Sequence, residues 1–144
     1  MKSSIFLLLI SICLFSCKKD SDSSNNSAIT TVNLAATAST GTWRITYYYD
    51  TDHEETANYA GYAFTFAGGN VLTATKLGST TATGTWTTGT DDSKVKLILA
   101  FATPANFNEL SDDWHVTGRT DTKIEMKDVS GGNGGTDFLT FEKN

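Results

Sequence analysis

Residues 41–50 read GTWRITYYYD, a segment in which aromatic and β-branched residues alternate with other side chains. Alternation is the pattern of a strand with one buried face, because successive side chains of a strand point to opposite sides. The residues that share one face here are Trp43, Ile45, Tyr47 and Tyr49. The segment therefore predicts a strand at 42–49 whose aromatic face lines either a packed core or a ligand pocket.

The same alternation recurs at short intervals through the rest of the chain. Seven further strands are predicted, at 61–67, 71–76, 80–87, 94–101, 113–118, 121–127 and 137–142. Pro104 suits the first turn of a helix, which predicts one short helix at 104–110. Consecutive strands joined by short turns pair antiparallel. We therefore expect an all-β protein, an eight-stranded antiparallel up-and-down barrel without open edges, and a two-sheet sandwich is the alternative.

Composition limits the classes of function. The chain has 144 residues, enough for one domain, and its net charge is −5. Lys18-Lys19 is the one basic cluster, which argues against nucleic acid as a partner because phosphate binding needs a positive surface. The two cysteines, Cys13 and Cys17, both precede residue 18, so a disulfide framework or a cysteine zinc site in the domain is excluded.

The first residues are typical of an export signal. Lys2 is followed by an apolar run of 11 residues from Ile5 to Phe15, which is too short to span a bilayer. The run ends at Leu14-Phe15-Ser16-Cys17, which resembles a bacterial lipobox, where a cysteine after a small residue is lipidated and becomes the mature N-terminus. The alternative is an ordinary cleaved signal with an incidental cysteine.

The lipobox implies three regions. Residues 1–16 are the signal peptide, residues 17–40 are the lipidated Cys17 and a flexible tether, and residues 41–144 are the barrel domain. The tether is expected because 18–40 is rich in Ser, Asn, Thr and Ala, although Val32 and Leu34 could dock on the domain or form a helical turn. The implied location is the bacterial cell envelope, anchored by lipid, with the outer membrane favoured.

Several motifs resemble those of the lipocalin-like, or calycin-like, small β-barrel lipoproteins of bacteria. They are Gly41-Thr42-Trp43 at the first strand, GYAFTF at 61–66, a second GTW at 84–86, DDW at 112–114 and the final FLTFEK. The resemblance implies that Trp43 packs across the closed end of the barrel. Lipocalins usually cover this tryptophan with an arginine near the last strand, and here Lys143 takes that place.

The aromatic residues expected to point inward are the candidate ligand-binding residues. They are Trp43, Tyr47, Tyr49, Tyr62, Phe64, Phe66, Trp86 and Trp114. Such residues can form a cavity for a small hydrophobic or amphipathic molecule, or they can fill the barrel, since eight strands enclose little more space than their own side chains need. Tyr48 and Tyr59 are expected on the outer surface.

Two polar clusters are weaker candidates. The loop from Asp50 to Glu55 gathers acidic residues around His53, but its spacing matches no EF-hand, which favours a solvated acidic loop. Asp113 and His115 share a strand face, but no nucleophile motif lies nearby. The Gly-rich segment 131–135 joins two predicted strands, which favours a hairpin turn over a phosphate-binding loop. We therefore expect no catalytic residues, no metal site, no cofactor and no enzymatic activity.

Two hypotheses of function remain. In the first, a lipid-anchored barrel holds a small hydrophobic molecule in the cell envelope. In the second, a filled barrel is a structural or interaction module whose outer face or loops bind a protein or a glycan. A continuous cavity would favour the first, and an aromatic patch on the outer wall would favour the second.

Overall fold

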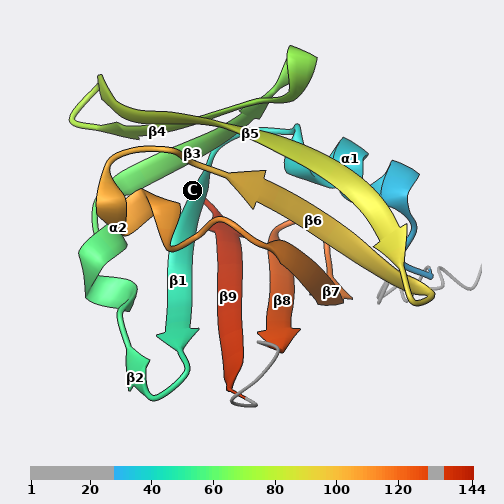
Figure 1. The fold of residues 1–144 in the computed structure, drawn as a ribbon. Coiled ribbons are helices and arrows are strands. Elements are labelled where there is room, and N and C mark those ends of the chain that lie inside the picture. Colours follow the sequence, from blue (N-terminus) through green and yellow to red (C-terminus); the bar gives the residue numbers. More distant parts are fainter. Residues whose placement is uncertain (1–27, 130–134) are drawn as a thin grey trace, which may run out of the picture.

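The computed structural model describes residues 28–129 and 135–144, and within them it is a closed antiparallel β-barrel of eight strands (Figure 1). The barrel strands are β1 (Trp43–Asp50), β3 (Tyr62–Ala67), β4 (Val71–Lys76), β5 (Ser79–Asp91), β6 (Lys94–Ala100), β7 (Asp113–Arg119), β8 (Lys123–Val129) and β9 (Thr136–Lys143). The predicted all-β barrel is confirmed. The predicted signal peptide, Cys17 and most of the predicted Gly-rich turn lie outside the described residues.

Each barrel strand pairs with its neighbour in the chain, and β1 also pairs with β9, which closes the barrel. The pairing between β1 and β3 is short, since its register contains only the pair Trp43 and Phe64. A two-residue strand, β2 (His53–Glu54), pairs antiparallel with the end of β1. Short helical segments are η1 (Thr56–Tyr59), η2 (Gly68–Asn70) and α2 (Ala105–Asn108), the last within the predicted 104–110.

The strand β5 is longer than the alternation predicted. It runs to Asp91, and its hairpin to β6 turns at Asp92 and Ser93, whose φ angles are 47° and 62°. Two successive residues with positive φ are typical of the turn that matches strand twist. Gly89, which lies beyond the predicted strand 80–87, pairs with Lys96 inside the ladder.

A bulge in β1 corrects the predicted strand faces. The register with β9 shifts between Ile45 and Tyr47, so Thr46 adds one residue to β1. An extra residue reverses the alternation beyond it. Tyr48 is therefore inside and only 2% exposed, whereas Tyr47 is outside and 38% exposed.

The predicted tether is shorter than expected, because part of it folds. Helix α1 (Thr31–Ala38) begins at the Thr30 cap, which forms a capping box with Asn33. Leu34 and Ala38 are fully buried, and the helix contacts β5 and β6. The folded unit thus begins before residue 41. Neither described helix has the length and apolar character needed to cross a membrane.

Candidate functional site

Five of the eight candidate ligand-binding residues pack in the core. Trp43, Phe64, Phe66, Trp86 and Trp114 are buried, and Tyr62 is half-buried. Most of these rings contact other aromatic residues, mainly edge to face: Phe66 meets both Trp86 and Phe141, with ring centres 5.5 Å apart in each pair. These contacts are the favoured geometry of packed aromatic cores. The rings therefore fill the interior of the barrel.

Tyr48 and Tyr59 are core residues, which corrects their expected position on the outer surface. Their rings contact each other at 5.5 Å, and Tyr59 also contacts Phe107 of α2. The Tyr48 hydroxyl donates a hydrogen bond of 3.1 Å to the carbonyl of Glu109, and the Tyr59 hydroxyl donates to the carbonyl of Asn106. Burial raises the pKa of both hydroxyls above the ordinary value of 10. These residues tie α2 to the barrel.

The main hollows lined wholly by described residues lie at the surface. They measure about 170 to 500 Å³, and Trp86 is the one candidate ligand-binding residue that lines any of the four. The largest, of about 500 Å³, lies beside Gly84, Phe101 and Ser111. The eight candidates therefore do not share one of these hollows.

Tyr47, Tyr49 and Phe138 form an aromatic strip on the outer wall, on β1 and β9. The rings of Tyr47 and Tyr49 are 6.4 Å apart and nearly parallel, at 16°, and Phe138 lies 6.4 Å from Tyr49. Tyr47 and Phe138 are 38% and 39% exposed. Both tyrosines were expected to point inward, because the bulge at Thr46 has no sequence signature.

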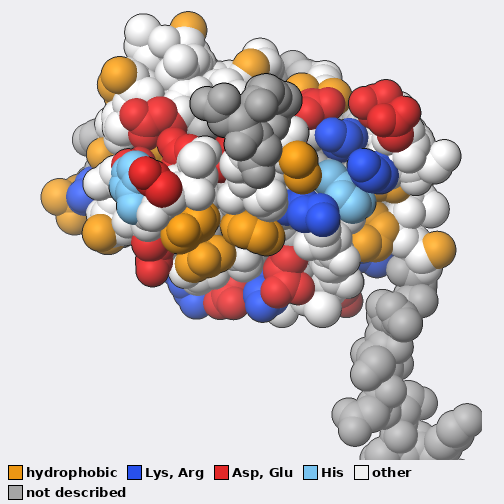
Figure 2. Space-filling view, turned by 60° about the horizontal axis from the view of Figure 1, so that its bottom comes forward, with side chains coloured by type: hydrophobic (Ala, Val, Ile, Leu, Met, Phe, Trp, Pro, Cys, Tyr) orange, Lys and Arg blue, Asp and Glu red, His pale blue; other side chains and the backbone are white. Residues whose placement is uncertain are grey.

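The strip belongs to an ordered row across six strands. In register, Lys96 lies opposite His115, His115 opposite Lys127, and Lys127 opposite Phe138. Phe138 then lies opposite Tyr49, and Tyr49 opposite Glu54. This outer-wall row, defined by these six residues, runs from basic through aromatic to acidic. Figure 2 shows the same order, with hydrophobic side chains between an acidic group and a group of lysines.

The acidic end of the row surrounds His53. Its two ring nitrogens contact Asp52 and Glu55, the second at 2.7 Å, and Asn58 donates to Glu55 at 3.2 Å. These hydrogen bonds raise the pKa of His53. Carboxylates at both ring nitrogens favour the protonated imidazole, and a protonated ring offers no free nitrogen to a metal.

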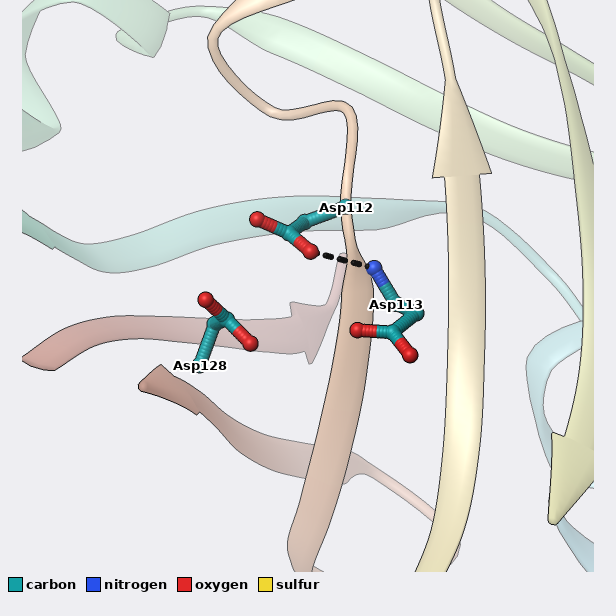
Figure 3. A group of neighbouring side chains, drawn as sticks. All are labelled: Asp112, Asp113 and Asp128. Atoms are coloured by element: carbon teal, nitrogen blue, oxygen red, sulfur yellow. Dashed lines mark hydrogen bonds between the residues drawn. The ribbon is translucent and has the colours of Figure 1, made fainter. Parts of the chain in front are cut away.

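Three aspartates gather at the start of β7 and the end of β8. Oxygens of Asp112, Asp113 and Asp128 lie within 4.8 Å of one another, close enough to hold a cation (Figure 3). Asp112 accepts a hydrogen bond of 2.6 Å from the Asp113 backbone NH, and burial raises the Asp112 pKa. The Lys96 ammonium lies 3.2 Å from Asp113, so a protein cation already neutralises part of this charge.

Arg119 is a buried cation that the sequence did not single out. Its side chain is 8% exposed, and its guanidinium donates to Thr37 of α1 and lies 3.8 Å from Asp121. With Lys143 it lines a hollow of about 450 Å³ under α1. A single arginine at a strand end carries no sequence signal, because its burial depends on where α1 packs.

Comparison with protein-family models, with curated proteins and with solved structures finds no match to this chain.

Proposed function

We propose that this protein is a lipid-anchored envelope module that binds a protein partner through its outer wall. The anchor is inferred from Leu14-Phe15-Ser16-Cys17 after the apolar run. A carrier function receives less support, because the rings expected to line a cavity pack against one another. The outer wall is then the part of the barrel available for recognition.

The outer-wall row is the observation that carries this proposal. Aromatic side chains are enriched at the centres of protein interfaces, where they become desolvated, and charged residues form the rim. Tyr47, Tyr49 and Phe138 supply such a centre, with Lys127 on one side and Glu54 on the other. Opposite charges at the two ends fix the direction in which a partner docks.

The row defines the chemistry of the partner. The partner carries an apolar patch, with acidic residues that meet Lys96 and Lys127 and basic residues that meet Glu54. A protein surface meets this requirement more readily than a glycan, since the two ends of the row carry opposite charges.

The test places a photo-crosslinking amino acid at Phe138 of the full chain, in cells that lipidate it. The control position is Leu77, which is 99% exposed but lies in the turn between β4 and β5. The expected result is one discrete protein adduct from position 138, absent from position 77. Glu54→Lys in the same chain weakens that adduct, because it reverses the acidic end of the row.

Other outcomes reject or redefine the partner. Equal adducts from both positions, or none from position 138, contradict the proposal. An adduct that glycosidases digest identifies a glycan and overturns the protein partner. An adduct of twice the chain mass identifies the partner as a second copy.

A further inference from the structure

The basic end of the outer-wall row lies over a small hollow. Lys94, Lys96, His115 and Lys127 line it together with Asp128 and Val129, and its volume is about 170 Å³. The four basic side chains come from three neighbouring strands, β6, β7 and β8. Figure 2 shows basic side chains gathered on this face.

The strand pairing brings these basic groups into one row. Lys96 pairs with His115, and His115 pairs with Lys127, so the imidazole lies between two lysines. Protonation of His115 would place like charges opposite one another, which destabilises a sheet. An anion in the hollow would offset that repulsion.

Nearby carboxylates neutralise only part of this charge. Lys96 donates to the Asp113 carbonyl at 2.8 Å and lies 3.2 Å from the Asp113 carboxylate. Among the described residues, neither Lys94 nor Lys127 has an ion-pair partner within 4.0 Å. Asp128 lines the edge of the hollow beside Asp112 and Asp113. Two lysines thus remain available to a ligand.

His115 lies among these lysines with a lowered pKa. Burial is the main cause, and Lys94, Lys127 and Lys96 lower the pKa further. The imidazole is therefore neutral near pH 7 and takes up a proton when an anion enters beside it.

We infer that this hollow binds a tetrahedral oxyanion, the phosphate or sulfate group of a larger molecule or of the free ion. Lysine ammonium groups bind phosphate as point charges, and His115 adds a donor from β7. The volume is below the 300 to 1,000 Å³ or so that a drug-sized ligand needs, and it suits a single oxyanion. The site shares Lys96, His115 and Lys127 with the outer-wall row, and its test measures anion binding at His115 without a protein partner.

The histidine pKa values provide the test. The full chain in detergent is titrated by NMR in sodium chloride and in sodium sulfate of equal ionic strength, and both imidazoles are followed. Sulfate is expected to raise the His115 pKa, by about one unit if it binds the protonated form tenfold more tightly. The pKa of His53, which lies among carboxylates, stays unchanged and reports general salt effects.

Matched variants assign the effect to the hollow. Lys94→Gln with Lys127→Gln abolishes the sulfate-induced shift of His115. Lys123→Gln retains it, because Lys123 lies on the same strand as Lys127 but pairs with Glu125 at 2.6 Å. The site is rejected if both histidines shift equally in sulfate, if neither shifts, or if Lys123→Gln abolishes the shift as well.

Vesicles distinguish the sources of the oxyanion. The non-lipidated Cys17→Ser chain is sedimented with vesicles of phosphatidylcholine alone or with added phosphatidic acid. Sedimentation that needs phosphatidic acid and is lost in the Lys94→Gln, Lys127→Gln variant supports a lipid headgroup. A sulfate shift without such sedimentation supports a free ion or another phosphorylated or sulfated molecule.

Discussion

The Lys143 ammonium lies 5.2 Å from the centre of the Trp43 ring, and the Trp43 indole donates a hydrogen bond of 2.9 Å to the carbonyl of Ala38. Trp43 is fully buried between the end of β9 and helix α1. The lysine thus takes the covering place that the resemblance to lipocalins assigns to an arginine. A cation over an indole face is held by the quadrupole of the ring.

Replacement of Lys143 tests this contact. Lys143→Ala is expected to lower the free energy of unfolding by about 0.5 to 1 kcal/mol, as measured by urea denaturation. Lys143→Arg preserves or raises stability, since a guanidinium stacks on aromatic faces better than an ammonium does. If both variants lose equal stability, the ring contact contributes nothing.

Gly84 is the first residue of the second GTW segment, and it lies where β5 approaches β6 closely. A Cβ at this position would lie 2.7 Å from Cδ1 of Phe101 and nearer still to the Ala100 carbonyl oxygen. Gly84→Ala is expected to cost about 1 to 3 kcal/mol in unfolding free energy through overpacking. Gly68→Ala is the control, because a Cβ there meets nothing within 4 Å. Similar losses in both variants would contradict the close approach.

The protein is expected to lose stability in alkali because of Tyr48 and Tyr59. Their hydroxyls lose protons near pH 10 in the unfolded chain but stay protonated in the folded one, because burial raises both pKa values. Stability is thus fully present below about pH 10 and falls above it, by up to about 1.4 kcal/mol per pH unit for each residue.

Urea denaturation of Tyr48→Phe at neutral pH and at about pH 11 checks this. At neutral pH the variant loses about 0.5 to 1.5 kcal/mol with the hydrogen bond to Glu109. Between the two pH values it loses less than the wild type, because one titrating hydroxyl is gone. Equal losses of stability in Tyr48→Phe and in the wild type between the two pH values would show that Tyr48 is not the titrating group.

His53 is expected to titrate above its ordinary pKa of about 6.5. Its hydrogen bonds to Asp52 and Glu55 stabilise the imidazolium, so their contribution to stability is full below about pH 6.5 and disappears as pH rises through the folded pKa. Asp52→Asn lowers this pKa in an NMR titration and leaves that of His115 unchanged. An unchanged His53 pKa in Asp52→Asn would show that Asp52 does not stabilise the imidazolium.

Lipidation is predicted at Cys17. In cells fed a labelled fatty acid, Cys17→Ser is expected to abolish incorporation of the label and to release the protein from the membrane fraction. Cys13→Ser retains the label, because Cys13 lies inside the apolar run, after Ile12. Label that survives Cys17→Ser would place the lipid on another residue, and absence of label in the wild type would leave an ordinary cleaved signal as the explanation.

The strand positions could be predicted from sequence because they follow from local alternation. Residues such as Leu97 and Leu99, or Ile124 and Met126, are spaced by two and are all buried. Tyr47 could not be placed, because the bulge at Thr46 arises from the pairing of β1 with β9, about 95 residues later in the chain.

Local sequence patterns could not predict the aromatic strip or the proposed oxyanion hollow either. Their residues are far apart in the sequence, as with Lys96, His115, Lys127 and Phe138. Taken alone, each has the pattern of a solvent-exposed strand residue. Only the register of four neighbouring strands brings them into one row.

The sequence by itself determined the barrel class and the strand order, since alternation and short turns act over a few residues, and it predicts an export signal with a candidate lipidation site. The tertiary structure decided which tyrosines fill the core, that Thr31–Ala38 belongs to the folded unit, and how charges are ordered across the outer wall. These features depend on pairing between distant segments, and a shift of one residue in that pairing turns a side chain from core to solvent.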